Sequence, residues 1–286
     1  MPTKNLKIGL VQAKVSSNSG RNLDKTAKFV SAAADKGAKI ACLQELFTLP
    51  YFCQAKDKKL FRLAEKIPGK ITEFLSETAK KNKIALVGGS IFEKGKDKKY
   101  YNTSLIFDEK GKITAKYRKT HIPYDPNYYE QVYFTPGNLG YCRAEAAGVK
   151  IAPLICYDQW YPEAARINAL KGAQIIFYPT AIGWTSDMKK LEPFSAQRWE
   201  DAMRSHASMN GVYAAAVNRV GKENNIDFWG GSFVADPFGE IVARAGSAKE
   251  EVLIAEIDLE KIKSSQQGWG FLRNRKPKSY GDLGKI

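Results

Sequence analysis

The sequence has no long hydrophobic run. Its longest stretch without a charged residue, from Gly172 to Ser186, contains a proline and a glycine and is shorter than a membrane-spanning helix requires. The amino-terminal apolar segment is short and soon reaches Gln12 and Lys14, so it does not match a secretory leader. We therefore expect a protein with no signal peptide and no membrane partner.

Cysteine and histidine are both scarce. The chain has 4 cysteines and 2 histidines among 286 residues, and no two cysteines form a CxxC pair. This set does not make a disulfide framework and lacks the ligand spacing of a zinc site. We expect no bound metal, and a reducing, cytoplasmic location fits this cysteine usage best.

Acidic residues are few compared with basic ones. The 30 Asp and Glu stand against 45 Lys and Arg, which gives a formal net charge of +15. The lysines form scattered clusters beside turns, as at 56–59 and 94–99, and no zinc-finger spacing, aromatic stripe or basic helix connects them. We expect a solvated basic surface and no specific nucleic-acid partner.

Apolar residues, at 44% of the chain, are abundant enough to form a full core, and their pattern alternates between strand and helix. The turn at 108–111 joins two strands as a hairpin, which predicts a mixed sheet covered by helices. No linker or repeat interrupts the pattern, so we expect a single α/β domain over 1–286, with a C-terminal extension at about 259–286. Strands are predicted at 6–13, 39–43, 84–90, 101–108, 113–119, 149–155, 175–178, 212–217, 231–235, 241–244 and 252–257, and helices at 22–36, 71–82, 162–170, 194–209 and 259–266.

Cys156 is the cysteine with the most distinctive surroundings. It lies where an apolar strand ends, shortly before a helix that opens at Pro162. Amide groups at a helix N-terminus stabilise a thiolate, so this position suits a nucleophile. A buried structural cysteine explains the same pattern when it is taken alone.

A thiol nucleophile needs a base, and the sequence offers several. His121 and His206 are the only histidines, and a structural, hydrogen-bonded imidazole is the better explanation of His121, with a papain-like cysteine–histidine pair left as the alternative. Glu45 ends a buried strand among apolar neighbours, where a carboxylate is costly to bury without a partner. Lys119, at the end of another strand, is the natural partner, although it also reads as a surface lysine.

Glu45, Lys119 and Cys156 each lie within a longer motif, and together these motifs resemble the nitrilase or carbon-nitrogen hydrolase superfamily along nearly the whole chain. The matching segments are LQELF at 43–47, YRKTHIP at 117–123 and ICYDQWYPEAAR at 155–166. Within the superfamily the chain is most similar to the N-carbamoylputrescine amidases of polyamine synthesis from agmatine. That likeness rests on CYDQW at 156–160, FYPTAIG at 177–183, YE with YFTPG at 129–137 and QGWGFLR at 267–273.

The resemblance implies a fold and a reaction. The fold is a four-layer α-β-β-α sandwich with mixed sheets, and the reaction is hydrolysis of a ureido C–N bond to an amine, CO2 and ammonia without a cofactor. Cys156 would be the nucleophile, Glu45 the general base, and Lys119 the cation that stabilises the oxyanion. Glu130 matches a second carboxylate near that lysine, with a surface loop residue as the alternative explanation.

The resemblance also implies a small carbamoyl or amide substrate. The residues expected to bind it are Tyr157, Ala181, Ile182, Trp184 and Asp187. Relatives often carry an acidic residue directly after Gly183, whereas here Trp184 and two further residues precede Asp187. Asp187 is our first choice to meet a substrate ammonium, with Tyr157 or Trp184 offering an aromatic face.

Three alternatives remain open. The first is an amidohydrolase for N-carbamoyl amino acids or β-ureidopropionate, and the second is a general aliphatic amidase or nitrilase. The third is a catalytically silent binding protein of the same fold. The resemblance also implies a homodimer or higher even-numbered oligomer, with the C-terminal extension at a subunit interface.

Overall fold

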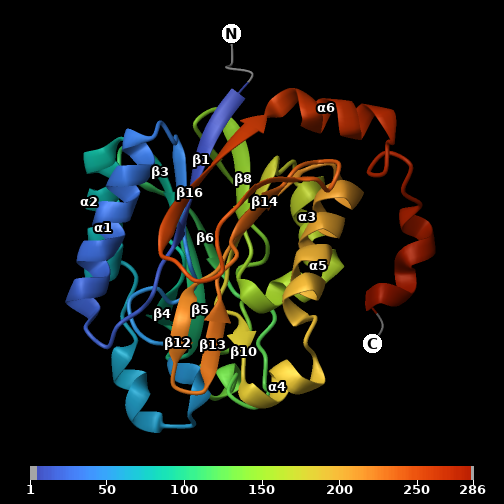
Figure 1. The fold of residues 1–286 in the computed structure, drawn as a ribbon. Coiled ribbons are helices and arrows are strands. Elements are labelled where there is room, and N and C mark those ends of the chain that lie inside the picture. The colour runs from blue at the N-terminus through green and yellow to red at the C-terminus, as the bar shows by residue number, and fades with distance from the viewer. Residues whose placement is uncertain (1–4, 285–286) are drawn as a thin grey trace.

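Two β-sheets stacked face to face occupy the centre of the molecule in the computed structural model, which describes residues 5–284 (Figure 1). The first sheet has seven strands in the order β16-β1-β2-β3-β5-β4, and β6 also pairs with β5. Neighbouring strands β1, β2 and β3 are parallel, whereas the other pairs are antiparallel. Its strands are β1 (Asn5–Gln12), β2 (Ile40–Leu43), β3 (Ala85–Val87), β4 (Ile91–Lys94), β5 (Tyr100–Phe107), β6 (Ile113–Arg118) and β16 (Glu251–Asp258).

The second sheet has six strands in the order β15-β14-β11-β9-β8-β7. Its central strands β8, β9 and β11 are parallel and its outer pairs are antiparallel, so both sheets are mixed as the hairpin predicted. The strands are β7 (Ala144–Ala146), β8 (Val149–Pro153), β9 (Ile175–Pro179), β11 (Tyr213–Val217), β14 (Phe233–Ala235) and β15 (Ile241–Arg244).

Helices cover the outer face of each sheet. α1 (Ser19–Asp35) and α2 (Lys70–Asn82) pack on the first sheet, and α3 (Pro162–Leu170) and α5 (Ser195–Asn210) pack on the second (Figure 1). Apolar side chains from the facing sides of both sheets, such as Ile8 and Phe177, form one core cluster between them. The four-layer α-β-β-α sandwich expected from the resemblance is therefore confirmed.

The C-terminal part of the chain runs outside the sandwich. α6 (Leu259–Gly268) crosses one end of the molecule, and the remaining segment descends along the outer side of α3 and α5 (Figure 1). Trp269 is 64% exposed and Phe271 is 48% exposed on this segment. Among the described residues, no helix is both long enough and apolar enough to cross a bilayer.

Several short elements were not predicted. A small three-stranded sheet of β10 (Gly183–Trp184), β13 (Ile226–Trp229) and β12 (Val220–Glu223) lies beside the two large ones, and β4 and β7 were also missed. These strands are short and most of them mix polar and apolar residues, so they lack the continuous apolar run that marks β2 and β3. The other unpredicted elements are α4 (Ser186–Leu191) and the 3-10 helices η1 (Phe52–Gln54), η2 (Lys58–Leu63), η3 (Glu130–Val132), η4 (Cys156–Trp160) and η5 (Pro277–Gly284).

The predicted strand at 84–90 ends at Val87 in the structure. Gly89 adopts a left-handed φ of 56°, and a side chain there would collide with the carbonyl of Gln44. Glycine allows this close approach, which brings the turn after β3 against the turn after β2. The second of these turns carries Glu45.

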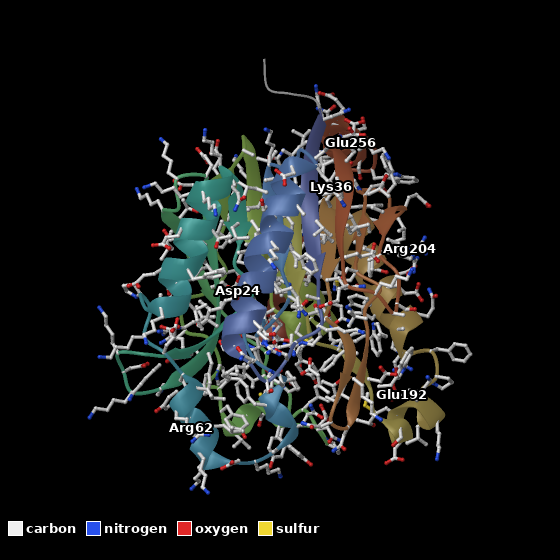
Figure 2. The ribbon with its side chains drawn as sticks, turned by 60° about the vertical axis from the view of Figure 1, so that its left-hand side comes forward. Asp24, Lys36, Arg62, Glu192, Arg204 and Glu256 are labelled. Carbon is white, nitrogen blue, oxygen red and sulfur yellow. The ribbon has the colours of Figure 1, made fainter. Side chains whose placement is uncertain are left out.

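Charged side chains of both signs are spread over the outside of the molecule. Figure 2 shows labelled examples, from Asp24 on α1 and Lys36 just after it to Arg204 on α5.

Candidate active site

Four predicted catalytic residues meet at one end of the sandwich. Glu45 follows β2 and Lys119 follows β6 in the first sheet, whereas Cys156 follows β8 in the second. The side chains of Glu45, Lys119 and Glu130 are at most 1% exposed, and Cys156 is 7% exposed. The site is thus enclosed and is assembled from both sheets.

Lys119 lies between two carboxylates. Its Nζ donates to Glu45 Oε1 at 2.9 Å and to Glu130 Oε2 at 2.6 Å. Asn102 Nδ2 also donates to Glu45 Oε1 at 2.8 Å, and the Tyr51 hydroxyl donates to Glu130 Oε1 at 2.7 Å. Glu45 Oε2 is buried and has no hydrogen-bond partner among the described residues. One carboxylate oxygen is therefore unpaired and able to accept a proton.

The charged groups in this cluster shift one another's pKa values. Burial acts to lower the pKa of Lys119, but Glu130 and Glu45 raise it well above its usual value, so the lysine is charged. Burial raises the pKa of Glu130 to about 7, against the lowering effect of Lys119. An ammonium has three N–H donors, and two of those on Lys119 are used by the carboxylates. The third is left to donate to a ligand.

Cys156 occupies a strained turn beside this cluster. Its φ is 43°, in the left-handed region that is uncommon for a residue with a side chain. Sγ lies 3.9 Å from the carbonyl oxygen of Ala181. Burial raises the pKa of the thiol well above its usual value, Glu45 raises it further, and Lys119 opposes this. The net effect of these groups favours the neutral thiol over the thiolate.

Asp158 holds the turn that carries Cys156. Its Oδ2 accepts a hydrogen bond from the Ile155 amide at 2.9 Å and from the Tyr117 hydroxyl at 2.8 Å. Its Oδ1 accepts from the His121 amide at 3.1 Å. Because these donors come from two sheets, the carboxylate fixes the nucleophile's turn relative to the strand that leads to Lys119.

The two histidines have partners of their own. His121 Nδ1 lies 2.7 Å from Asp158 Oδ1, and the ring stacks on Tyr161 with centroids 3.6 Å apart. His206 Nε2 lies 2.7 Å from the carbonyl oxygen of Gln159. Both imidazoles thus have the structural, hydrogen-bonded role that was one of the two readings of the sequence.

The predicted substrate-binding residues extend outward from Cys156. Tyr157 is half-buried next to the nucleophile, and Ala181 presents its carbonyl to Sγ. Ile182 is half-buried, and its backbone N–H donates to Asn218 Oδ1 at 3.0 Å. These three positions therefore line the surroundings of the thiol.

Trp184 and Asp187 lie farther out, on a groove of about 520 Å3. Trp184 packs in the same apolar cluster as Cys156, and its indole N–H is buried without a partner among the described residues. Asp187 is exposed in the first turn of α4. The structure gives it no contact with the catalytic cluster among the described residues, and its role stays a prediction.

Comparison with known proteins identifies the family of this chain. A family model described as carbon-nitrogen hydrolase matches residues 7–267. The chain belongs to the carbon-nitrogen hydrolase family. This hydrolase is 42% identical over 267 residues to the N-carbamoylputrescine amidase of Solanum lycopersicum, covering 91% of this chain and 88% of the relative. It is 36% identical to the citrullinase of Francisella tularensis, with 98% of each chain covered.

Among solved structures, the hydrolase resembles a carbon-nitrogen hydrolase from Helicobacter pylori G27. The TM-score is 0.93 at 39% identity, and 98% of each chain is covered. The expectation of a carbon-nitrogen hydrolase, and hence of an enzyme, is therefore confirmed. Among residues 5–284, no group of three or more His, Cys, Asp and Glu gathers as metal ligands would.

Sequence reasoning missed several residues that support the hydrolase's site. Asn102 and Tyr51 bond directly to the two carboxylates, and Arg219 is fully buried nearby. Asn102 carries no distinctive signal, because Thr103 and Ser104 in the same strand are also polar. Arg219 carries none either, since nothing in its local sequence distinguishes a buried arginine from a surface one.

Proposed function

We propose that this hydrolase is a cysteine-dependent amidohydrolase that cleaves carbamoyl substrates, with N-carbamoylputrescine as the first candidate. The observation that carries the proposal is the buried group of Glu45, Lys119, Glu130 and Cys156, in which Glu45 Oε2 has no hydrogen-bond partner among the described residues and Glu45 interacts electrostatically with the Cys156 thiol. A thiol that does not ionise by itself requires a proton acceptor, and this oxygen is one.

Attack begins when Cys156 Sγ bonds to the ureido carbon and Glu45 Oε2 takes the thiol proton. The carbonyl π electrons move to oxygen, where the remaining N–H of Lys119 and backbone N–H groups near Cys156 stabilise the negative charge. A fixed cation in an enclosed site does this far more effectively than one in water. Glu130 keeps Lys119 in place through the 2.6 Å ion pair.

Collapse of the tetrahedral species breaks the C–N bond, and Glu45 returns the proton to the departing ammonia. Water then attacks the S-carbamoyl enzyme while Glu45 accepts its proton. The C–S bond breaks, the proton passes to the Cys156 sulfur, and the product carbamate loses CO2 to leave the amine. In this cycle the proton transfers to and from the Cys156 sulfur and to the departing ammonia all pass through one carboxylate.

The relatives named above support a carbamoyl substrate. For a diamine product, the substrate's ammonium would lie along the groove, where Asp187 and Asp227 supply negative charge. The aromatic face of Trp184 is less available than the sequence suggested, because Lys189 Nζ lies 5.1 Å from its ring centre.

A second candidate substrate is a carbamoylated amino acid such as citrulline. The groove holds Lys189 and Lys222 as well as the two aspartates, so it offers charges of both signs to a zwitterion. The unpaired indole N–H of Trp184 can donate to a carboxylate. The name of the Francisella relative supports the same candidate.

The test is a comparison of kcat/KM for N-carbamoylputrescine, citrulline, N-carbamoyl-β-alanine and a simple amide, with ammonia and the amine product both measured. We expect N-carbamoylputrescine to be preferred, and Asp187→Asn to raise its KM with little change in kcat. Faster turnover of citrulline with Asp187→Asn indifferent would favour the second candidate. No turnover of any substrate would contradict the proposed activity and favour a silent binding protein.

A further inference from the structure

Arg219 is a fully buried charge directly behind the catalytic base. It follows β11, and its side chain is 0% exposed. Nη2 donates to the carbonyl oxygen of Glu45 at 2.7 Å and to that of Leu46 at 3.0 Å. Nη1 donates to both carboxylate oxygens of Glu223, at 2.8 and 2.9 Å. The Arg219 guanidinium thus binds the backbone of Glu45 as well as the carboxylate of Glu223.

The peptide that Arg219 holds is under strain. Leu46 has a φ of 46°, and its N–H donates to Ser90 Oγ at 3.0 Å. Left-handed backbone at a branched side chain persists only where its surroundings enforce it. Arg219, which binds the Leu46 carbonyl, and Ser90, which binds the Leu46 N–H, hold the backbone in this conformation. Because Arg219 also binds the Glu45 carbonyl, the backbone of Glu45 is held in place, and this determines where its side chain points.

Glu223 extends the same connection to the second carboxylate. Its Oε2 accepts the Tyr51 amide N–H at 2.6 Å, and the Tyr51 hydroxyl donates to Glu130 at 2.7 Å. One chain of contacts therefore runs from Arg219 to both carboxylates that flank Lys119.

Asn218, the residue before Arg219, holds the other side of the site. Its Oδ1 accepts the Ile182 N–H at 3.0 Å, and its Nδ2 donates to the carbonyl oxygens of Ile182 at 2.9 Å and Gly230 at 3.1 Å. Ile182 directly follows Ala181, whose carbonyl faces Cys156 Sγ. Two adjacent side chains thus hold the segments next to the base and next to the nucleophile.

We propose that Asn218 and Arg219 are positioning residues that together set the separation between Glu45 and Cys156. The two reacting groups are carried by different sheets, and this dipeptide contacts a segment beside each of them. The inference rests on the proposed roles of Glu45 and Cys156. Displacement of catalytic groups by about 1 Å costs about a hundredfold in rate, so such positioning has a measurable effect.

The test uses Arg219→Lys and Asn218→Ala. Lysine keeps the charge opposite Glu223 but cannot make the forked contact with two carbonyls. We expect kcat to fall by about 10- to 100-fold in each variant while KM stays within about threefold. The matched controls are Arg244→Lys, on β15 of the same sheet, which alters an ion pair with Glu200 on α5, and Asn210→Ala, which removes a buried side-chain bond to the His206 carbonyl. Both controls should keep wild-type kcat.

A second measurement needs no substrate. Amide hydrogen exchange should rise in the segments 45–47 and 181–183 of the two variants and stay unchanged in the rest of the sandwich. The inference would be overturned by an unchanged kcat or by unchanged exchange in these segments. It would also be overturned if the activity of the variants fell only in proportion to their folded fraction. Failure of the proposed function would instead appear as inactive wild-type enzyme with the exchange result intact.

Discussion

At the scale of single residues, the surroundings of Cys156 determine which kind of cysteine chemistry the site can perform. A thiolate stabilised by a neighbouring cation would be ready before substrate arrives. Here burial and Glu45 keep the proton on sulfur, despite Lys119 nearby. In the proposed mechanism proton transfer therefore accompanies attack, so turnover should depend on Glu45 as strongly as on Cys156.

Replacing Cys156 with alanine should leave less than about one per cent of wild-type turnover, since loss of a covalent nucleophile costs several orders of magnitude. Unfolding temperature should change little, because only one sulfur atom is removed. Cys142→Ala, at a half-buried cysteine away from the cluster, is the control and should remain active. Iodoacetamide should inactivate the wild type in step with alkylation of Cys156. Turnover by Cys156→Ala well above one per cent would argue against a covalent route.

The pH profile should report Glu130. Because its pKa is raised to about 7, the carboxyl takes up a proton as the pH falls through that value, and its ion pair with Lys119 is lost. We expect kcat/KM to decline on the acid side with a midpoint near pH 7. Tyr51→Phe removes a hydrogen bond that favours the ionised form, so the midpoint should move to higher pH. If the decline of kcat/KM at low pH had the same midpoint in Tyr51→Phe as in the wild type, Glu130 would not be the group that causes it.

The sequence was a good guide to some site residues and a poor guide to others. Glu45, Lys119 and Cys156 could each be placed at a strand end, whereas Glu130 rested on the family resemblance. Asn102 and Arg219 could not be found, because their partner Glu45 is 57 and 174 residues away along the chain. Contacts of that span depend on how the sheets pack, which no local pattern records.

At the scale of elements, continuous apolar runs were predicted well, including short ones such as β2 and β14, whereas short strands of mixed polarity were missed. The strand over 149–155 and the helix over 162–170 correspond to β8 and α3, because a continuous apolar run and an N-terminal proline are strong local signals. The hairpin of β12 and β13 has four residues in each strand and was missed, although it carries Glu223.

The turn at Gly89 offers a test of how elements place the base. Gly89→Ala should lower both the unfolding temperature and kcat, because a methyl group there meets the Gln44 carbonyl next to Glu45. Gly140→Ala is the matched control, since it has a φ of 69° but open space around the added carbon. In both variants a left-handed backbone with a side chain destabilises the folded state by about 1–2 kcal/mol. Only Gly89→Ala should also lower the specific activity of the folded enzyme. Equal specific activity in the two folded variants would contradict this explanation.

At the scale of the whole molecule, the outer side of α3 and α5 and the C-terminal segment expose several large apolar side chains. Leu170 is 46% exposed and Met209 is 53% exposed, and Trp269 and Phe271 lie on the segment that runs beside these helices (Figure 1). Large exposed apolar groups of this kind are typical of interfaces.

We expect this face to pair two copies of the chain. Light scattering should give a mass of at least twice the 31.9 kDa chain, and Leu170→Ser with Trp269→Ser should shift the population toward monomer. Leu139→Ser, at a leucine 49% exposed outside this face, is the control and should leave the mass unchanged. A single 31.9 kDa species for the unmodified chain at micromolar concentration would contradict the expectation.

The division of the site between two sheets has a consequence for how the protein fails. Glu45 and Lys119 belong to one layer and Cys156 to the other, so a slight slip of one layer over the other separates proton acceptor from sulfur while every strand stays intact. In mild urea, turnover should therefore vanish while the far-ultraviolet circular dichroism signal is still native. Enzymatic activity therefore reports on how well the two sheets are packed against each other.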